Sequence, residues 1–195
     1  MKKFIFSAAV ALLSLVAANA QAVWDIDASH SSIRFSVPHM MVSETEGVFK
    51  KFTGKITAKD VNFTNAQVDF SVDVNSINTD SESRDGHLKS DDFFSAAKFP
   101  AMTFKSTSFK KVKGNKYQVE GNLTIRNVTK KVKVDVVYGG TVKDPYGNTK
   151  AGFKAQFVID RQLYGLSFNK TLETGGALVG NNVTVDLKFE FALAK

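Results

Sequence analysis

Residues 183–191 read VTVDLKFEF, and this stretch decides the fold class of the chain. Every second position is apolar: Val183, Val185, Leu187, Phe189 and Phe191. The positions between them are polar or charged: Thr184, Asp186, Lys188 and Glu190. Such alternation is typical of a β-strand with one buried face and one face in water, because successive side chains of a strand point to opposite sides.

The same alternation recurs along the chain. It is clear in segments 33–37, 67–74 and 131–136, and weaker in 47–57, 101–113, 116–125 and 148–159. Turn residues separate several of these segments: 113–116 reads KGNK, which predicts a tight hairpin, and 144–148 reads DPYGN, which predicts a longer turn. We therefore predict an all-β fold with about eight antiparallel strands.

Residues 80–97 are the one segment with a helical pattern, with Leu88 and Phe94 as its apolar anchors. Strands of this kind close into a barrel or pack as a sandwich, and the local pattern does not distinguish the two. A composition with 17 Phe and a single Trp favours a closed eight-stranded barrel that holds one elongated ligand. A core filled by the same side chains is the alternative.

The N-terminus has the three zones of a secretory signal peptide: the basic Met1-Lys2-Lys3, an apolar run from Phe4 to Ala18, and small residues up to Ala20. Cleavage after residue 20 or 22 satisfies the small-x-small rule and leaves a single domain, residues 21–195. The apolar run is shorter than the roughly 20 residues of a spanning helix. We expect a protein of the bacterial periplasm, or a secreted one.

The chain has no cysteine, which excludes a disulfide scaffold, a zinc ribbon, a Cys-ligated iron–sulfur cluster and a thiol nucleophile. Loss of Lys2 and Lys3 with the signal peptide lowers the formal net charge from +7 to +5. Lysines cluster in 110–116 and 130–133, but export separates the protein from nucleic acid, so we expect no such partner. A basic rim at a barrel end predicts transient contact with an anionic membrane surface, and solubilising edge charge is the alternative.

Five ordered blocks resemble the YceI-like family of polyisoprenoid-binding proteins. They are WDIDASHSSIRFSVPHM at 24–40, GVFKKFTGKI at 47–56, RDGHLKSDDFFSAAKFPAMTFKS at 84–106, GNLTIRNVTKKV at 121–132 and IDRQLYGLSFN at 159–169. The resemblance implies an exported, lipocalin-like barrel around a long isoprenoid chain. The ligand is then an isoprenoid quinone or a polyprenyl phosphate, with no catalytic cofactor.

Burying such a chain is favourable by about 25 cal/mol per Å² of apolar surface, so the inward side chains are the candidate ligand contacts. Strand parity gives a predicted lining of Phe35, Val37, Phe70, Val72, Phe104, Leu123, Val134, Val136, Phe157, Leu187 and Phe189. Simple core packing is the alternative for each of them.

A polar head group requires donors at the barrel mouth. Four residues of the family-like blocks lie next to predicted strand or helix ends: His39, Arg84, His87 and Arg161. The forked guanidinium of arginine suits a phosphate, whereas a quinone requires a donor but no charge. Solvated surface is the alternative for these side chains.

Catalytic and metal motifs are missing from the sequence. It has no GxSxG elbow, P-loop or GxGxxG. His30, His39 and His87 form no HxH, HxxxH or HExxH arrangement, so we predict no metal site and no enzyme. The alternative function is a periplasmic hydrolase with a His/carboxylate or metal site on a β scaffold. The oligomeric state, monomer or homodimer, stays open.

Overall fold

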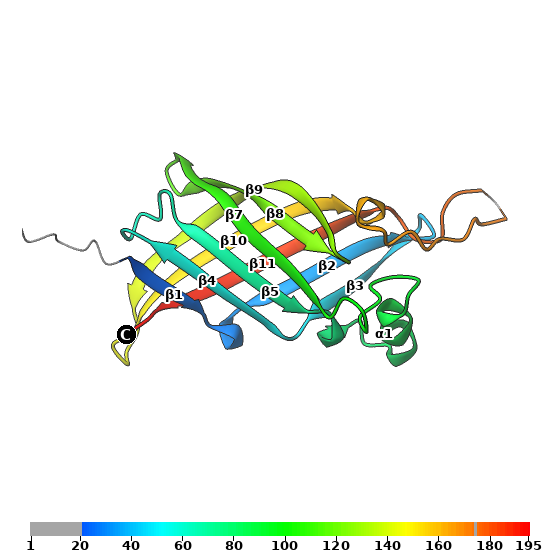
Figure 1. Ribbon diagram of the computed structural model, residues 1–195, viewed down its shortest axis with the longest axis horizontal. Coiled ribbons are helices and arrows are strands. Elements are labelled where there is room, and N and C mark those ends of the chain that lie inside the picture. The colour runs from blue at the N-terminus through cyan, green and yellow to red at the C-terminus, as the bar shows by residue number, and fades with distance from the viewer. Residues whose placement is uncertain (1–20, 174) are drawn as a thin grey trace, which may run out of the picture.

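The computed structural model describes residues 21–173 and 175–195 (Figure 1). The predicted signal peptide, residues 1–20, lies outside the described residues. Among the helices that are described, none is long and apolar enough to cross a membrane.

Most of the described chain is β-structure. The strands are β1 Ala22–Ile26, β2 Ser32–His39, β3 Ser43–Phe49, β4 Phe52–Ala58, β5 Gln67–Asp73, β6 Ile77–Asn78, β7 Ala101–Lys113, β8 Lys116–Ile125, β9 Val128–Lys143, β10 Thr149–Asp160 and β11 Asn182–Leu193. The helices are α1 Glu82–Lys89 and the short 3-10 turns η1 Ala28–His30, η2 Val74–Ser76 and η3 Arg161–Tyr164.

These strands fill eight positions of one closed barrel (Figure 1). Three positions are each shared by two strands that continue one another: β1 with β2, β3 with β4, and β5 with β6. Positions that follow one another in sequence are neighbours in the barrel, and every pairing is antiparallel. The result is an up-and-down barrel.

The C-terminal strand closes the ring. Along one edge β11 pairs with β10, and along the other it pairs with β2 and then with β1. The two sheets of a sandwich would leave open edge strands, so this closure confirms the predicted antiparallel eight-stranded barrel. The KGNK hairpin is also confirmed, because Lys113 is paired with Lys116 and Gly114 has a φ of 58°.

The helix is shorter than the sequence predicts. It ends at Lys89, and the Ser90 hydroxyl donates a hydrogen bond to the His87 carbonyl at 2.7 Å. Turns follow, in which the Ser95 hydroxyl donates to Asp91. Short polar side chains that bind nearby polar groups in this way compete with helical hydrogen bonds, so the prediction of a helix up to residue 97 was wrong. Phe94 nevertheless reaches the barrel interior, as its apolar character indicates.

One end of the barrel is plugged by aromatic side chains. Trp24 is fully buried there, with its ring centroid 5.2 Å from that of Phe63. Tyr117 and Phe153 belong to the same cluster. The β7–β8 hairpin and the C-terminus lie at this end, whereas α1 and residues 161–173 and 175–181 lie at the opposite end (Figure 1). The barrel is therefore a tube that aromatic side chains pack at one end.

Candidate ligand cavity

The interior between the aromatic plug and α1 holds a cavity of about 560 Å³. All eight strand positions contribute side chains to its wall. The wall includes each of the apolar residues that strand parity predicts: Phe35, Val37, Phe70, Val72, Phe104, Leu123, Val134, Val136, Phe157, Leu187 and Phe189. Their contact with a ligand stays a prediction, but their common position is a property of the fold.

Three glycines make room for aromatic rings in the wall. Gly47 is paired with Phe35, and Gly54 with Phe70. A Cβ atom at either glycine would lie 2.4 Å from the ring of its partner, and a Cβ at Gly121 would meet Phe104 equally closely. Only glycine lets these rings lie against the barrel wall, which leaves the axis of the tube open.

The structure also identifies lining residues that the sequence analysis missed. Ile33 and Phe49 lie on strands, and Ile33 shares the parity of Phe35, so alternation was a sufficient signal for it. Phe168, Lys170 and Leu178 come from the irregular residues 165–173 and 175–181, which we call the 165–181 segment. A segment without periodicity offers no signal for which of its side chains turn inward.

The mouth is covered by an aromatic contact between α1 and the 165–181 segment. The ring of His87 is edge-on to Phe93 and Phe168, with centroid distances of 5.0 and 4.7 Å. Its Nε2 lies 2.8 Å from the Asp92 carboxylate. His87 lines the cavity, as expected for a mouth residue, but its interactions hold two covering segments together.

Arg84 anchors α1 to the end of β6. Its Nε and Nη2 donate to the hydroxyl and carbonyl of Thr79 at 2.8 and 2.7 Å. Thr79 in turn donates from its hydroxyl and backbone N–H to the buried Asp85 at 2.6 and 2.8 Å. Arg84 is exposed and borders the cavity, and three of its five N–H groups remain available, so its role at the mouth stays a prediction.

Arg161 lines the cavity and also has a structural role that the sequence does not indicate. It is only 4% exposed, and its donors reach the carbonyls of Leu166, Val179 and Gly180. Burial lowers the pKa of Arg161 from its ordinary value. Because three of its N–H groups bind these carbonyls, Arg161 holds the 165–181 segment in place, and its use as a head-group donor stays a prediction.

His39 and Lys170 are the mouth residues whose side chains have no hydrogen-bond or ion-pair partner within residues 21–173 and 175–195. His39 ends β2 and forms a β-bridge with Val179. Both side chains border the cavity. They are the groups best placed to meet a polar head group.

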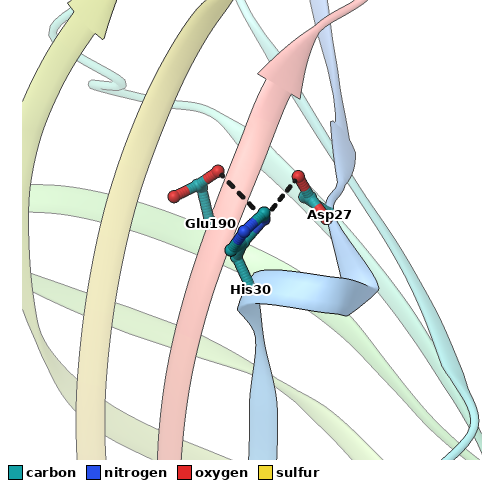
Figure 2. Close-up of side chains that lie close together, drawn as sticks. All are labelled: Asp27, His30 and Glu190. Carbon is teal, nitrogen blue, oxygen red and sulfur yellow. Dashed lines mark hydrogen bonds and ion pairs between the residues drawn. The ribbon is translucent and has the colours of Figure 1, made fainter. Parts of the chain in front are cut away.

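A separate cluster of His and carboxylate side chains lies outside the cavity (Figure 2). His30 Nδ1 is 3.0 Å from Asp27 and 3.8 Å from Glu190. The ammonium of Lys150 lies 2.6 Å from Asp27 and 3.1 Å from Glu190, so a cation already neutralises these carboxylates. The cluster connects the end of β1 to β10 and β11 through ion pairs. Because Lys150 already balances the carboxylate charge, the cluster gives no support for a metal site.

Lys150 to Met should lower the free energy of unfolding at pH 7 by about 1.5–3 kcal/mol, the range for hydrogen bonds to charged groups. Hydrogen bonds from Lys150, Ser29 and His30 hold the pKa of Asp27 well below its usual range, and Asp27 in turn raises the pKa of Lys150. Because the pKa of Asp27 is lower in the folded state than in the unfolded state, its ionised carboxylate stabilises the fold fully above the unfolded pKa of about 4. This stabilisation is lost as the pH falls toward the folded pKa.

Urea unfolding of the wild type and Lys150→Met between pH 2 and 8 checks this prediction, with the exposed Lys131→Met as the control. The difference in the free energy of unfolding between the wild type and Lys150→Met should be constant above pH of about 5 and should shrink in acid. A difference in free energy that grows as the pH falls would contradict the stabilising role of the Asp27–Lys150 ion pair.

A family model described as a YceI-like domain matches residues 24–191. A UPF0312 protein of Staphylococcus epidermidis is 36% identical over 171 residues, which cover 87% of this chain and 97% of the relative. A UPF0312 protein of Staphylococcus aureus is 35% identical over 170 residues, covering 87% of this chain and 96% of that one.

Solved structures show the same barrel. BcnA of Burkholderia cenocepacia superimposes with a TM-score of 0.74 at 23% identity, covering 85% of this chain and 98% of that chain. A YceI protein of Campylobacter jejuni has a TM-score of 0.69 at 30% identity, covering 81% and 90%. A polyisoprenoid binding domain from Saccharophagus degradans has a TM-score of 0.64 at 16% identity, covering 88% and 98%. By its sequence and its barrel, this chain belongs to the YceI-like family.

Proposed function

We propose that this protein binds one long-chain isoprenoid lipid, an isoprenoid quinone or a polyprenyl phosphate, and carries or sequesters it after export. The observation that carries the proposal is the cavity of about 560 Å³ inside the barrel. Its volume is within the roughly 300–1,000 Å³ of pockets that enclose one ligand. Apolar side chains form most of its wall, so an apolar chain gains by leaving water for it.

The charges of the wall support a head group with acceptor oxygens. Among the described residues, no Asp or Glu lines the cavity, and the charged residues that line it at the mouth are cationic: Arg84, Arg161 and Lys170. A phosphate or a quinone carbonyl accepts hydrogen bonds from such groups. The proposed orientation places the isoprenoid chain toward the aromatic plug and the head near His39 and Lys170.

A hydrolase receives no comparable support. The carboxylate pair that follows α1 is engaged in exposed contacts: Asp91 lies 2.8 Å from Lys98, and Asp92 binds His87. The hydrogen bond from Lys98 lowers the pKa of Asp91, as in a structural ion pair. We therefore propose a binding protein.

Export is part of the proposal. The first strand begins at Ala22, which is paired with Ala58 on β4. Signal cleavage after residue 20 leaves this strand whole, whereas cleavage after residue 22 removes its first residue. We therefore favour a mature periplasmic chain that begins at Gln21.

Mass spectrometry of the protein purified without detergent from a periplasmic extract tests the proposal. We expect a mature chain that begins at Gln21 and one isoprenoid per chain in the organic extract, whose mass identifies its head group. An extract without isoprenoid, also after incubation with a quinone and a polyprenyl phosphate, would refute the proposed ligand class.

A further inference from the structure

The turn between β2 and β3 exposes three successive apolar side chains beside the cavity mouth. Met40, Met41 and Val42 are 42%, 75% and 83% exposed. The preceding residue, His39, lines the cavity, and the Met40 N–H donates to the Leu178 carbonyl at 2.9 Å. This turn lies at the same end of the barrel as α1 (Figure 1).

The backbone of this turn is unfavourable for its own residues. The Val42 N–H donates to the His39 carbonyl at 3.2 Å, and Met40 and Met41 have φ values of 53° and 62°. Positive φ at both central residues defines a type I′ turn, for which Asn-Gly is strongly preferred. The other described tight hairpins follow this preference in part, with Gly114-Asn115 and Arg126-Asn127.

Two methionines in a left-handed turn lower stability, and their exposure means that little packing compensates for it. When residues disfavoured in a turn bring no compensating packing to the fold, their presence there points to a functional role rather than a structural one. Here the gain must come from an apolar phase outside the molecule.

We infer that the Met40–Val42 turn inserts into the interface of a lipid bilayer and places the cavity mouth against the membrane for lipid exchange. The inference rests on the proposed isoprenoid-binding function, because a membrane is where such a ligand resides. Three exposed side chains are far fewer than the about 20–30 residues a side of a stable protein interface, whereas bilayers bind small apolar protrusions.

The contact is apolar rather than electrostatic. The exposed charged residues of the segments that adjoin the turn include Glu44 and Glu46 on β3, and Lys170 and Glu173, so the turn has no excess of positive charge. The lysine cluster at 110–116 surrounds the β7–β8 hairpin at the plugged end, and the one at 130–133 lies on β9, which pairs with neither β2 nor β3. A bilayer of uncharged phosphatidylcholine should therefore suffice, and salt should not weaken the contact.

The decisive variant is Met40→Asn with Met41→Gly, which installs the preferred turn sequence. It should unfold at a higher urea concentration than the wild type and bind phosphatidylcholine vesicles at least about tenfold more weakly in co-sedimentation. The matched control is Val61→Ser with Val112→Ser, which removes side chains that are 63% and 64% exposed outside this turn. The control should bind vesicles like the wild type.

Three results overturn the inference. They are equal vesicle binding by the wild type and the turn variant, absence of binding by the wild type, and sedimentation without vesicles that shows self-association lost only in the turn variant. Organic extraction of the same preparations keeps the two proposals apart. If the turn variant retains one isoprenoid per chain, its cavity is intact, and any loss of vesicle binding is then caused by the change in the turn. Protein without isoprenoid in every preparation refutes the ligand and, with it, the role in lipid exchange.

Discussion

Phe157→Asp should abolish lipid retention and leave the barrel folded. Phe157 lies on β10 with its side chain in the cavity wall, and it belongs to none of the three buried clusters of the described residues. A carboxylate there must be desolvated by an apolar ligand without any partner charge. We expect a loss of affinity of at least about 100-fold, which corresponds to about 3 kcal/mol.

The neighbouring residue supplies the control. Val158 is 58% exposed on the outer face of the same strand, so Val158→Asp should bind lipid like the wild type. Phe157→Leu, which keeps the wall apolar, should also retain most of the affinity. Titration with a fluorescent isoprenoid and circular dichroism measure binding and folding separately. Full binding by a folded Phe157→Asp protein would exclude the cavity as the lipid site.

Arg161→Met should lower the free energy of unfolding by about 3 kcal/mol and release the 165–181 segment. The change leaves the carbonyls of Leu166, Val179 and Gly180 without their buried donor. Each unsatisfied group is destabilising by about 1–3 kcal/mol, although water reaching the loosened segment reduces the sum. Since this segment covers the mouth, bound lipid should dissociate faster.

Hydrogen exchange and urea unfolding test this second prediction. Protection should fall in the peptides around residues 165–181 and persist in β4 and β8. Arg126→Met is the control, because Arg126 donates a single hydrogen bond to Gly165 at 2.6 Å, and its loss should have a clearly smaller effect. Equal effects of the two changes would show that Arg161 has no special part in holding the segment.

Alternation alone identified the strands and the inward residues, because side-chain direction in a strand follows from position. Phe35, Val37 and Phe157 could be placed in the wall in this way. The first strand was missed, since Ala22–Ile26 is short and adjoins the predicted cleavage site. The helix was extended too far because the Ser and Asp side chains after Lys89 decide where it stops.

The roles of the polar residues depend on contacts that the sequence does not show. His39, Arg84, His87 and Arg161 all border the cavity, but their hydrogen bonds differ completely. Arg161 is bound to carbonyls up to 19 positions away, and only the folded segment brings these together. Likewise the Asp27–Lys150 contact joins residues 123 positions apart, which no local pattern reports.

The sequence by itself determined the fold class, the number of barrel strands and the inward face of most of them, since a period of two is written into each strand. The tertiary structure alone decided which end of the tube is plugged, which arginine binds backbone carbonyls and where an apolar turn lies beside the mouth. These properties depend on contacts between distant segments and on the closure of β11 against β1 and β2. Such contacts exist only once the chain is folded.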